Sequence, residues 1–74
     1  MIDNKYGQVS LEFKPDAPAD EPCFVFRAQD EFAVEVLRYY ADLVFEKTGN
    51  LKMDKDINKQ ADAFDAWPVK KTPD

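Results

Sequence analysis

The chain contains no histidine and only one cysteine, Cys23. An intrachain disulfide is therefore impossible, and every common zinc-binding pattern is missing. Nucleophilic catalysis by a serine or cysteine also lacks its usual histidine base. Because every Asp and Glu falls on a predicted wet face or in a loop, the sequence offers no buried carboxylate for acid–base work. We expect a protein that is not an enzyme and that binds no metal or cofactor.

Long hydrophobic runs are missing as well. No apolar stretch approaches the roughly 18 residues of a membrane span, and the first residues lack the basic start and apolar stretch of a signal peptide. Ten basic residues against fifteen acidic ones give a net charge of −5, which argues against direct binding to nucleic-acid phosphates. We expect a cytoplasmic protein with no membrane contact and no direct nucleic-acid contact.

The chain is short, at 74 residues, yet its composition is that of an ordered globular protein, with 45% hydrophobic and 14% aromatic residues. A domain of this size buries only about 60% of the surface that its unfolded chain exposes. Since disulfides and metals are excluded, a second subunit is the simplest remaining source of stability. We therefore expect a homodimer or higher homo-oligomer.

A long amphipathic helix is predicted in the middle of the chain, from about residue 31 to residue 47. Asp30 is a good N-cap, and Lys47 followed by Gly49 suits the C-terminal end. At about 100° per residue, the apolar residues cover more than half of the circumference. The main part of this arc holds Phe32, Ala33, Val36, Leu37, Tyr40, Leu43 and Val44, and its extension holds Val34, Ala41 and Phe45. Such a helix needs more than one neighbour.

The opposite side of this helix carries an acidic ridge. The ridge consists of Glu31, Glu35, Asp42 and Glu46, with Arg38 at its edge. A ridge of like charges is tolerated where water screens it, so a solvated face is one interpretation. The other is an acidic surface that is offered to a basic partner.

Two strands are predicted before the helix. Residues 6–14 alternate between apolar and polar side chains, and residues 23–27 form a short aromatic run in which Phe24 and Phe26 share one face. The proline-rich acidic stretch 15–22 reads as an exposed loop between them. The simplest arrangement pairs residues 23–27 antiparallel with residues 8–13.

A second helix is predicted from about residue 53 to residue 67, followed by a loose tail, residues 68–74. Its apolar stripe contains Met53, Ile57, Ala61, Phe64 and Trp67. This stripe suits packing against the first helix. The predicted fold is a single α+β domain, residues 1–74, in which a two-stranded antiparallel hairpin precedes an antiparallel pair of helices (ββαα).

One stretch matches part of an EF-hand calcium loop. Residues 54–58 fit its first five positions, and Asp62 and Asp65 fall at its ninth and twelfth. However, Lys59 occupies the position that requires glycine, and Asp65 is too short to replace the bidentate glutamate. We therefore predict that these residues are helical.

The run 24–30, which leads straight into an amphipathic helix, and the run 60–67 resemble small uncharacterised proteins encoded in tailed-phage and prophage genomes. The resemblance implies a phage origin and expression in the cytoplasm of a bacterial host. It implies no activity, and it assigns no role to any residue.

The leading hypothesis is a non-enzymatic protein–protein interaction module, which inhibits a host protein or a host defence by occupying it. The excess apolar surface predicts self-association through Val34, Ala41 and Phe45. The exposed contact residues are expected to be Arg27, Arg38 and Tyr39, because Arg and Tyr are enriched in binding hot spots. The alternative is an acidic decoy, a DNA mimic that blocks a nucleic-acid-binding protein.

Overall fold

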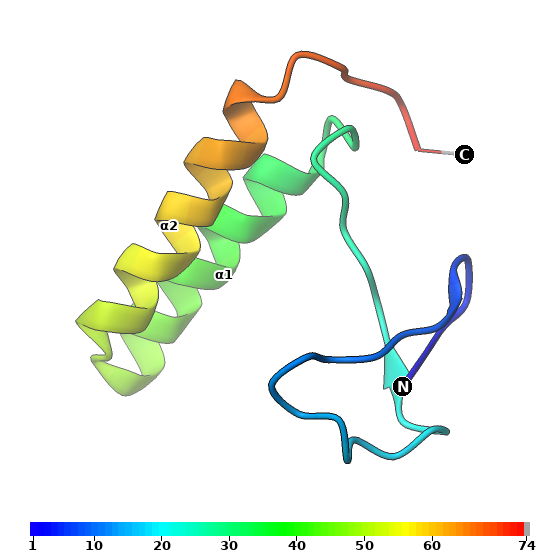
Figure 1. Cartoon of the computed structure of the whole chain (residues 1–74). Coiled ribbons are helices and arrows are strands. Elements are labelled where there is room, and N and C mark those ends of the chain that lie inside the picture. The colour runs from blue at the N-terminus through cyan, green and yellow to red at the C-terminus, as the bar shows by residue number, and fades with distance from the viewer. Residues whose placement is uncertain (74) are drawn as a thin grey trace.

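The computed structural model describes residues 1–73 and shows three short strands followed by two helices. The strands are β1 (Ile2–Asp3), β2 (Gly7–Gln8) and β3 (Pro22–Cys23), and the helices are α1 (Ala33–Thr48) and α2 (Leu51–Ala66). The strands lie in one part of the molecule and the helices in another (Figure 1). The α+β class is therefore confirmed, although the arrangement of its strands differs from the prediction.

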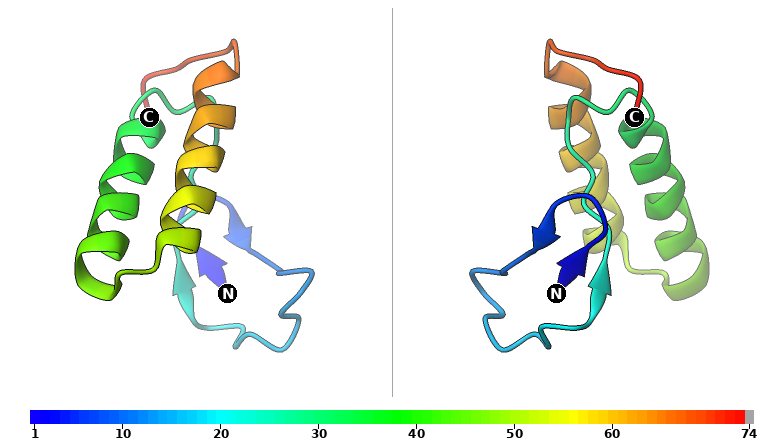
Figure 2. Two further views of the ribbon diagram at one scale, coloured as in Figure 1. Left: turned by 90° about the vertical axis from the view of Figure 1, so that its left-hand side faces the viewer. Right: turned by 90° about the vertical axis from the view of Figure 1, so that its right-hand side faces the viewer.

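The two helices lie side by side and antiparallel, as predicted (Figures 1 and 2). Only Gly49 and Asn50 join them. Gly49 has a φ of 68°, which glycine adopts without strain, and its N–H donates to the Phe45 carbonyl at 2.9 Å. The Asn50 side chain accepts from the Met53 N–H at 3.0 Å. This cap explains why α2 begins at Leu51, two residues before the predicted start.

The start of α1 differs from the prediction by two residues. The Asp30 carboxylate accepts from the Phe32 N–H at 2.9 Å, and the Asp30 carbonyl accepts from the Ala33 N–H at 3.1 Å. Phe32 occupies the N-cap position, and its side chain makes no capping hydrogen bond. Asp30 therefore stabilises the turn that leads into α1, whereas the helix itself begins at Ala33.

The contact between the helices is built from small side chains. The buried apolar residues of the described chain are Ala33, Ala41, Val44 and Ala61. Alanines allow two helices to approach closely, but each of them buries little apolar area. No large side chain is fully buried within residues 1–73, so the core is thin.

The predicted strand pairing is wrong. Residues 6–14 contain only the two-residue strand β2, and β3 replaces the strand predicted at residues 23–27. The central strand is β1, which pairs antiparallel with β2 and parallel with β3. The predicted pairing of residues 8–13 with residues 23–27 does not form, because β1 lies between β2 and β3. Phe13 is left 90% exposed.

The C-terminal residues do not form the loose tail that was predicted for residues 68–74. The Lys71 N–H donates to the Gln29 carbonyl at 2.6 Å, and the Lys71 carbonyl accepts from the Glu31 N–H at 3.1 Å. The Lys70 ammonium donates to the Ala28 carbonyl at 3.0 Å. These residues are held by backbone pairing, and the sequence did not predict it because backbone pairing leaves no side-chain pattern. Position 74 lies outside the described residues.

The molecule therefore has two parts, which we call the N-terminal lobe (residues 1–25) and the helical hairpin (residues 33–66). A connecting segment, residues 26–32, runs between them (Figure 1). Within residues 1–73 no strand lies against either helix. The radius of gyration is 13.7 Å, whereas a compact chain of this length has one of about 11 Å. The two parts stand apart and leave a gap.

Candidate interaction surface

The N-terminal lobe is organised around the buried carboxylate of Asp3, which is 3% exposed. Its Oδ1 accepts from the backbone N–H groups of Lys5 and Tyr6, each at 2.8 Å. Its Oδ2 accepts from the Val25 N–H at 2.7 Å. Asp3 thus connects the turn between β1 and β2 with the segment that follows β3.

The hydrogen bond from the Tyr6 N–H, followed by the one from the Val25 N–H, lowers the pKa of Asp3, and these bonds outweigh the opposing effect of burial. A carboxylate with a lowered pKa is a weak base, and this one already accepts three backbone donors. The role of Asp3 is therefore structural. The expectation that every Asp and Glu lies on a wet face or in a loop was wrong at Asp3. The signal that was available is an Asp just ahead of a tight turn that ends at Gly7, the typical setting of an Asx turn.

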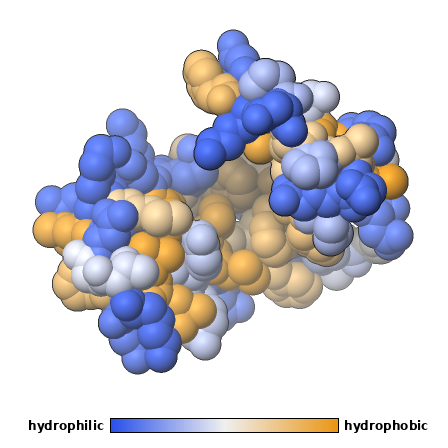
Figure 3. Space-filling model, turned by 90° about the horizontal axis from the view of Figure 1, so that it is seen from below, coloured by the Kyte–Doolittle hydropathy of each residue, from blue (hydrophilic) through white to orange (hydrophobic). Residues whose placement is uncertain are grey.

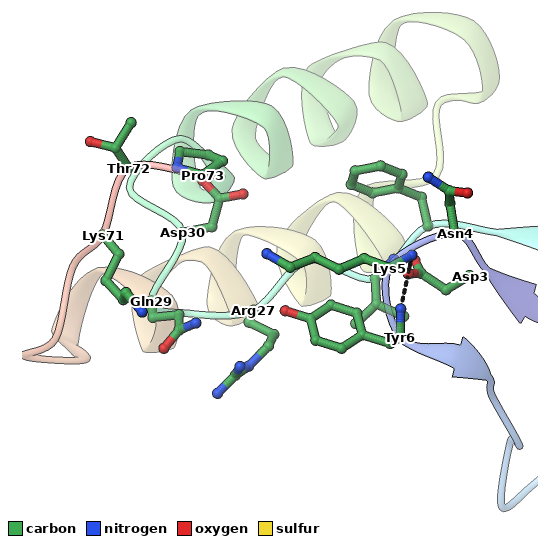
Figure 4. A pocket seen from close by; sticks show the side chains of 12 residues that line it. Asp3, Asn4, Lys5, Tyr6, Arg27, Gln29, Asp30, Lys71, Thr72 and Pro73 are labelled. Carbon is green, nitrogen blue, oxygen red and sulfur yellow. Dashed lines mark hydrogen bonds between the residues drawn. The ribbon is translucent and has the colours of Figure 1, made fainter.

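A cavity of about 240 Å³ lies between the lobe, the connecting segment and the C-terminal residues (Figure 4). It is lined by Asp3, Asn4, Lys5, Tyr6, Phe24, Val25, Arg27, Gln29, Asp30, Lys71, Thr72 and Pro73. The Lys5 ammonium and the Arg27 guanidinium lie 5.7 and 5.9 Å from the centre of the Tyr6 ring, within cation–π range. Arg27, predicted as an exposed contact residue, is exposed at this cavity.

The other predicted contact residues are spread around α1 and do not form one patch. Ala41 is fully buried against α2, so the expectation that it contributes an outer surface was wrong. Arg38 donates to Asn58 at 3.2 Å and to Asp62 at 2.8 Å, which ties the helices together. Val34 is half-buried. Tyr39 and Phe45 are both exposed, but at about 100° per residue they point roughly 120° apart.

The acidic ridge is exposed along its whole length. Glu31 accepts from the Thr72 hydroxyl at 3.1 Å. Glu35, Asp42 and Glu46 form no ion pair within residues 1–73. These three carboxylates are therefore fully available to solvent or to a partner.

Large apolar side chains are left uncovered on one face of the helical hairpin. On α1 they recur every four residues, and on α2 at spacings of eleven and three residues, which places them on one side of each helix. We call this set the apolar face: Phe32, Val36, Tyr40, Met53, Phe64 and Trp67. All except Phe64, which is half-buried, are exposed.

The apolar face lies opposite the ion pair that joins the helices. Arg38 meets Asp62 across one side of the hairpin. At about 100° per residue, Val36 and Tyr40 point to the other side of α1, and Met53 and Trp67 point to the other side of α2. The sequence had placed Phe32, Val36 and Tyr40 in the covered arc. This was wrong, because the residues that the pairing of the helices buries are Ala33, Ala41, Val44 and Ala61 instead.

The connecting segment crosses one end of the apolar face. A hollow of about 310 Å³ is lined by Phe26, Arg27, Ala28, Gln29, Phe64 and Trp67. The ring of Phe26 also contacts that of Phe24, with 4.9 Å between the ring centres, although residues 24–27 do not form the strand that was predicted. Seen from below, apolar surface lines the recess between the two parts of the molecule (Figure 3). The gap is therefore walled by apolar side chains.

Comparisons with protein-family models, with curated proteins and with solved structures gave no match. Within residues 1–73 no group of three or more Cys, Asp or Glu side chains is arranged to hold a metal ion. The stretch that resembles a calcium loop is part of the continuous helix α2, which confirms its prediction as helix. Among the described residues, neither helix has both the length and the apolar character needed to cross a bilayer.

Proposed function

We propose that this chain is a non-enzymatic protein–protein interaction module that works as a homo-oligomer and binds a further protein. The observation that carries the proposal is the size of its surface. The accessible surface is 5988 Å², whereas a folded monomer of 8.5 kDa exposes about 4,700 Å². The surplus is about 1,300 Å² per copy, more than the roughly 800 Å² that each partner buries in an interface of standard size.

The composition of this surplus supports the same proposal. Fourteen large hydrophobic residues of the described chain are exposed, whereas the buried apolar residues are three alanines and one valine. Monomeric proteins rarely expose continuous apolar patches beyond a few hundred Å², and larger ones mark interaction sites. Association with another copy removes this surface from water and supplies the apolar burial that a single copy lacks.

Self-association is tested by multi-angle light scattering and by sedimentation velocity across the micromolar range. We expect a molar mass that is a whole multiple of the 8.5 kDa chain mass and that falls on dilution. A monodisperse monomer at every concentration contradicts the proposal.

The further partner is proposed to be a protein of a bacterial host, which the module inhibits by occupying it. The resemblance to small phage-encoded proteins supports this choice of partner. The test is chemical cross-linking in a bacterial lysate, followed by mass spectrometry and reconstitution from purified components. A captured protein that does not rebind the purified chain contradicts this part of the proposal.

A second candidate function is an acidic decoy, and the unpaired carboxylates of Glu35, Asp42 and Glu46 favour it. A decoy that binds through charge loses affinity steeply as salt rises. The decisive variant carries Glu35→Gln, Asp42→Asn and Glu46→Gln. Its matched control, Asp16→Asn with Asp20→Asn and Glu21→Gln, has the same net charge. A decoy requires that only the ridge variant loses affinity for the reconstituted partner and loses its salt dependence. Equal behaviour of the two variants excludes the decoy.

A further inference from the structure

We propose that the apolar face binds the apolar face of a second copy about a two-fold axis, so that the four helices of the two copies pack as one bundle. The inference rests on the proposed self-association and goes beyond it by assigning the surface and the symmetry. It also differs from the sequence-based expectation, which placed self-association at Val34, Ala41 and Phe45.

The first argument is that most of the apolar face is not covered within its own chain. No strand lies against α1 or α2 in the described residues, and the connecting segment crosses only the end at Phe64 and Trp67. The exposed fractions of Tyr40 and Trp67 are 49% and 53%, although both are large aromatic residues. Aromatic side chains bury more area than any others, and they dominate the energetics of interfaces.

The second argument is that the connecting segment is bonded to the C-terminal residues on both sides of Asp30. Lys71 donates to the Gln29 carbonyl and accepts from Glu31, and Lys70 donates to Ala28. These bonds fix the part of the segment that leads into α1, and docking of a second copy on the apolar face leaves them intact.

The third argument concerns charge. The six residues of the apolar face are uncharged, and the charged residues that point the same way, Lys47 on α1 and Asp56 on α2, are opposite in sign. At about 100° per residue, the three unpaired carboxylates of the acidic ridge point roughly 80 to 160° away from Val36 and Tyr40. Pairing through the apolar faces therefore keeps the two acidic ridges apart and in water, which avoids the repulsion that contact between like charges would bring.

The fourth argument is area. Two copies together carry a surplus of about 2,600 Å² over the surface of compact monomers. This value lies in the range of about 2,000 to 5,000 Å² that obligate homodimers bury. A two-fold axis pairs the same patch on both copies, so one self-complementary apolar face is sufficient.

The test compares two aromatic residues of α1 that are equally exposed on different faces. Tyr40 belongs to the apolar face and is 49% exposed, and Phe45 lies on the opposite flank and is 50% exposed. Tyr40→Glu places a carboxylate in the proposed contact of both copies, and Phe45→Glu makes the same change outside it. By sedimentation equilibrium we expect Tyr40→Glu to raise the dimer dissociation constant by about 100-fold or more, as for an interface hot spot. Phe45→Glu is expected to change it by less than about threefold.

Circular dichroism gives the helical content of both variants, which is expected to stay at the wild-type value because both positions are exposed in the single chain. Dissociation by Phe45→Glu but not by Tyr40→Glu overturns the assigned face and leaves self-association standing. A dimer that neither substitution weakens also overturns the assigned face and leaves self-association standing. A wild-type chain that is monomeric at all concentrations overturns both this inference and the proposed self-association.

Discussion

The helical hairpin is held by contacts between apolar side chains and by caps that join near neighbours in the sequence, whereas the N-terminal lobe is held by short strand pairings and one buried charged group. In the hairpin, Asn50 accepts from the N–H of Met53, three residues away, and Ala41 and Ala61 are buried. Within residues 1–25 the one buried residue is Asp3, which joins β1 to Val25 across 22 positions. The hairpin therefore spreads its stability over many small contributions, whereas the lobe adds to its short strand pairings a single carboxylate that accepts three N–H groups.

This difference determines how each part responds to the loss of one interaction. Removing one contribution from the hairpin shifts a cooperative equilibrium by a limited amount. Removing the Asp3 carboxylate leaves three backbone N–H groups without an acceptor at once, and a buried donor without a partner is costly.

Asp3→Ala is expected to disorder the N-terminal lobe and to leave the helical hairpin folded. The substitution removes the acceptors of the Lys5, Tyr6 and Val25 N–H groups. Hydrogen exchange measured by NMR should show these amides exchanging at rates close to those of an unfolded chain, while the amides of α1 and α2 stay protected. Asp3→Asn, which keeps one acceptor oxygen, should give intermediate exchange. Equal protection in the wild type and in Asp3→Ala contradicts the role assigned to the carboxylate.

Acid is expected to reproduce part of this effect without a substitution. The hydrogen bonds from Tyr6 and Val25 lower the pKa of Asp3 below its ordinary value of 3.8. A carboxyl group whose folded-state pKa is lowered stabilises the folded state above its unfolded pKa, and this contribution disappears as the pH falls through the folded value. The amide signals of Tyr6 and Val25 should therefore shift together below pH 3.8 in the wild type. A change of the same size in these amide signals over the same pH range in Asp3→Asn contradicts the assignment to Asp3.

Ala61→Leu is expected to destabilise the helical hairpin. Ala61 has no exposed surface, and added methylene groups in a packed contact typically cost about 1 to 3 kcal/mol. Ala63→Leu is the matched control, because Ala63 lies on the same helix and is exposed. Its effect should stay within about 0.5 kcal/mol. Urea unfolding followed by circular dichroism at one protein concentration measures both variants, and equal effects would show that α2 packs differently.

Asn50→Ala is expected to have the smallest of these effects, a loss of about 1 kcal/mol from the hairpin. The Asn50 side chain accepts from the Met53 N–H at the start of α2. Asn50→Asp keeps an acceptor at this position and should retain nearly all of the wild-type stability in the same urea titration. If Asn50→Asp is as destabilised as Asn50→Ala, the capping bond is not the source of the stability.

The helices were predictable because their signals are local. Gly49 ends α1, Pro68 follows α2, and apolar residues recur at helical spacing between these points. The sheet was not predictable from its pattern. Residues 9–13 alternate as a half-buried strand should, but a strand also requires a partner, and β1 pairs with β2 and β3 instead. Beside this pairing, Asp3 accepts from the Val25 N–H, which is too distant in the sequence to leave a local signal.

The apolar character of the central helix was visible in the sequence, but its covered side was not. The arc is so broad that α2 can be placed at more than one position around it. The observed pairing buries the small residues Ala33, Ala41 and Ala61 and leaves Val36 and Tyr40 outside. Only the pairing of the helices determines which part of such an arc is available for binding.

The position of Trp67 has a practical consequence for spectroscopy. It is the chain's single tryptophan, and its indole lies half in water at the end of α2, beside the hollow under residues 26–29. Because indole emission moves to shorter wavelength when the ring leaves water, this residue is an intrinsic optical probe of whatever enters the gap. No dye or label has to be attached to the chain to follow that event.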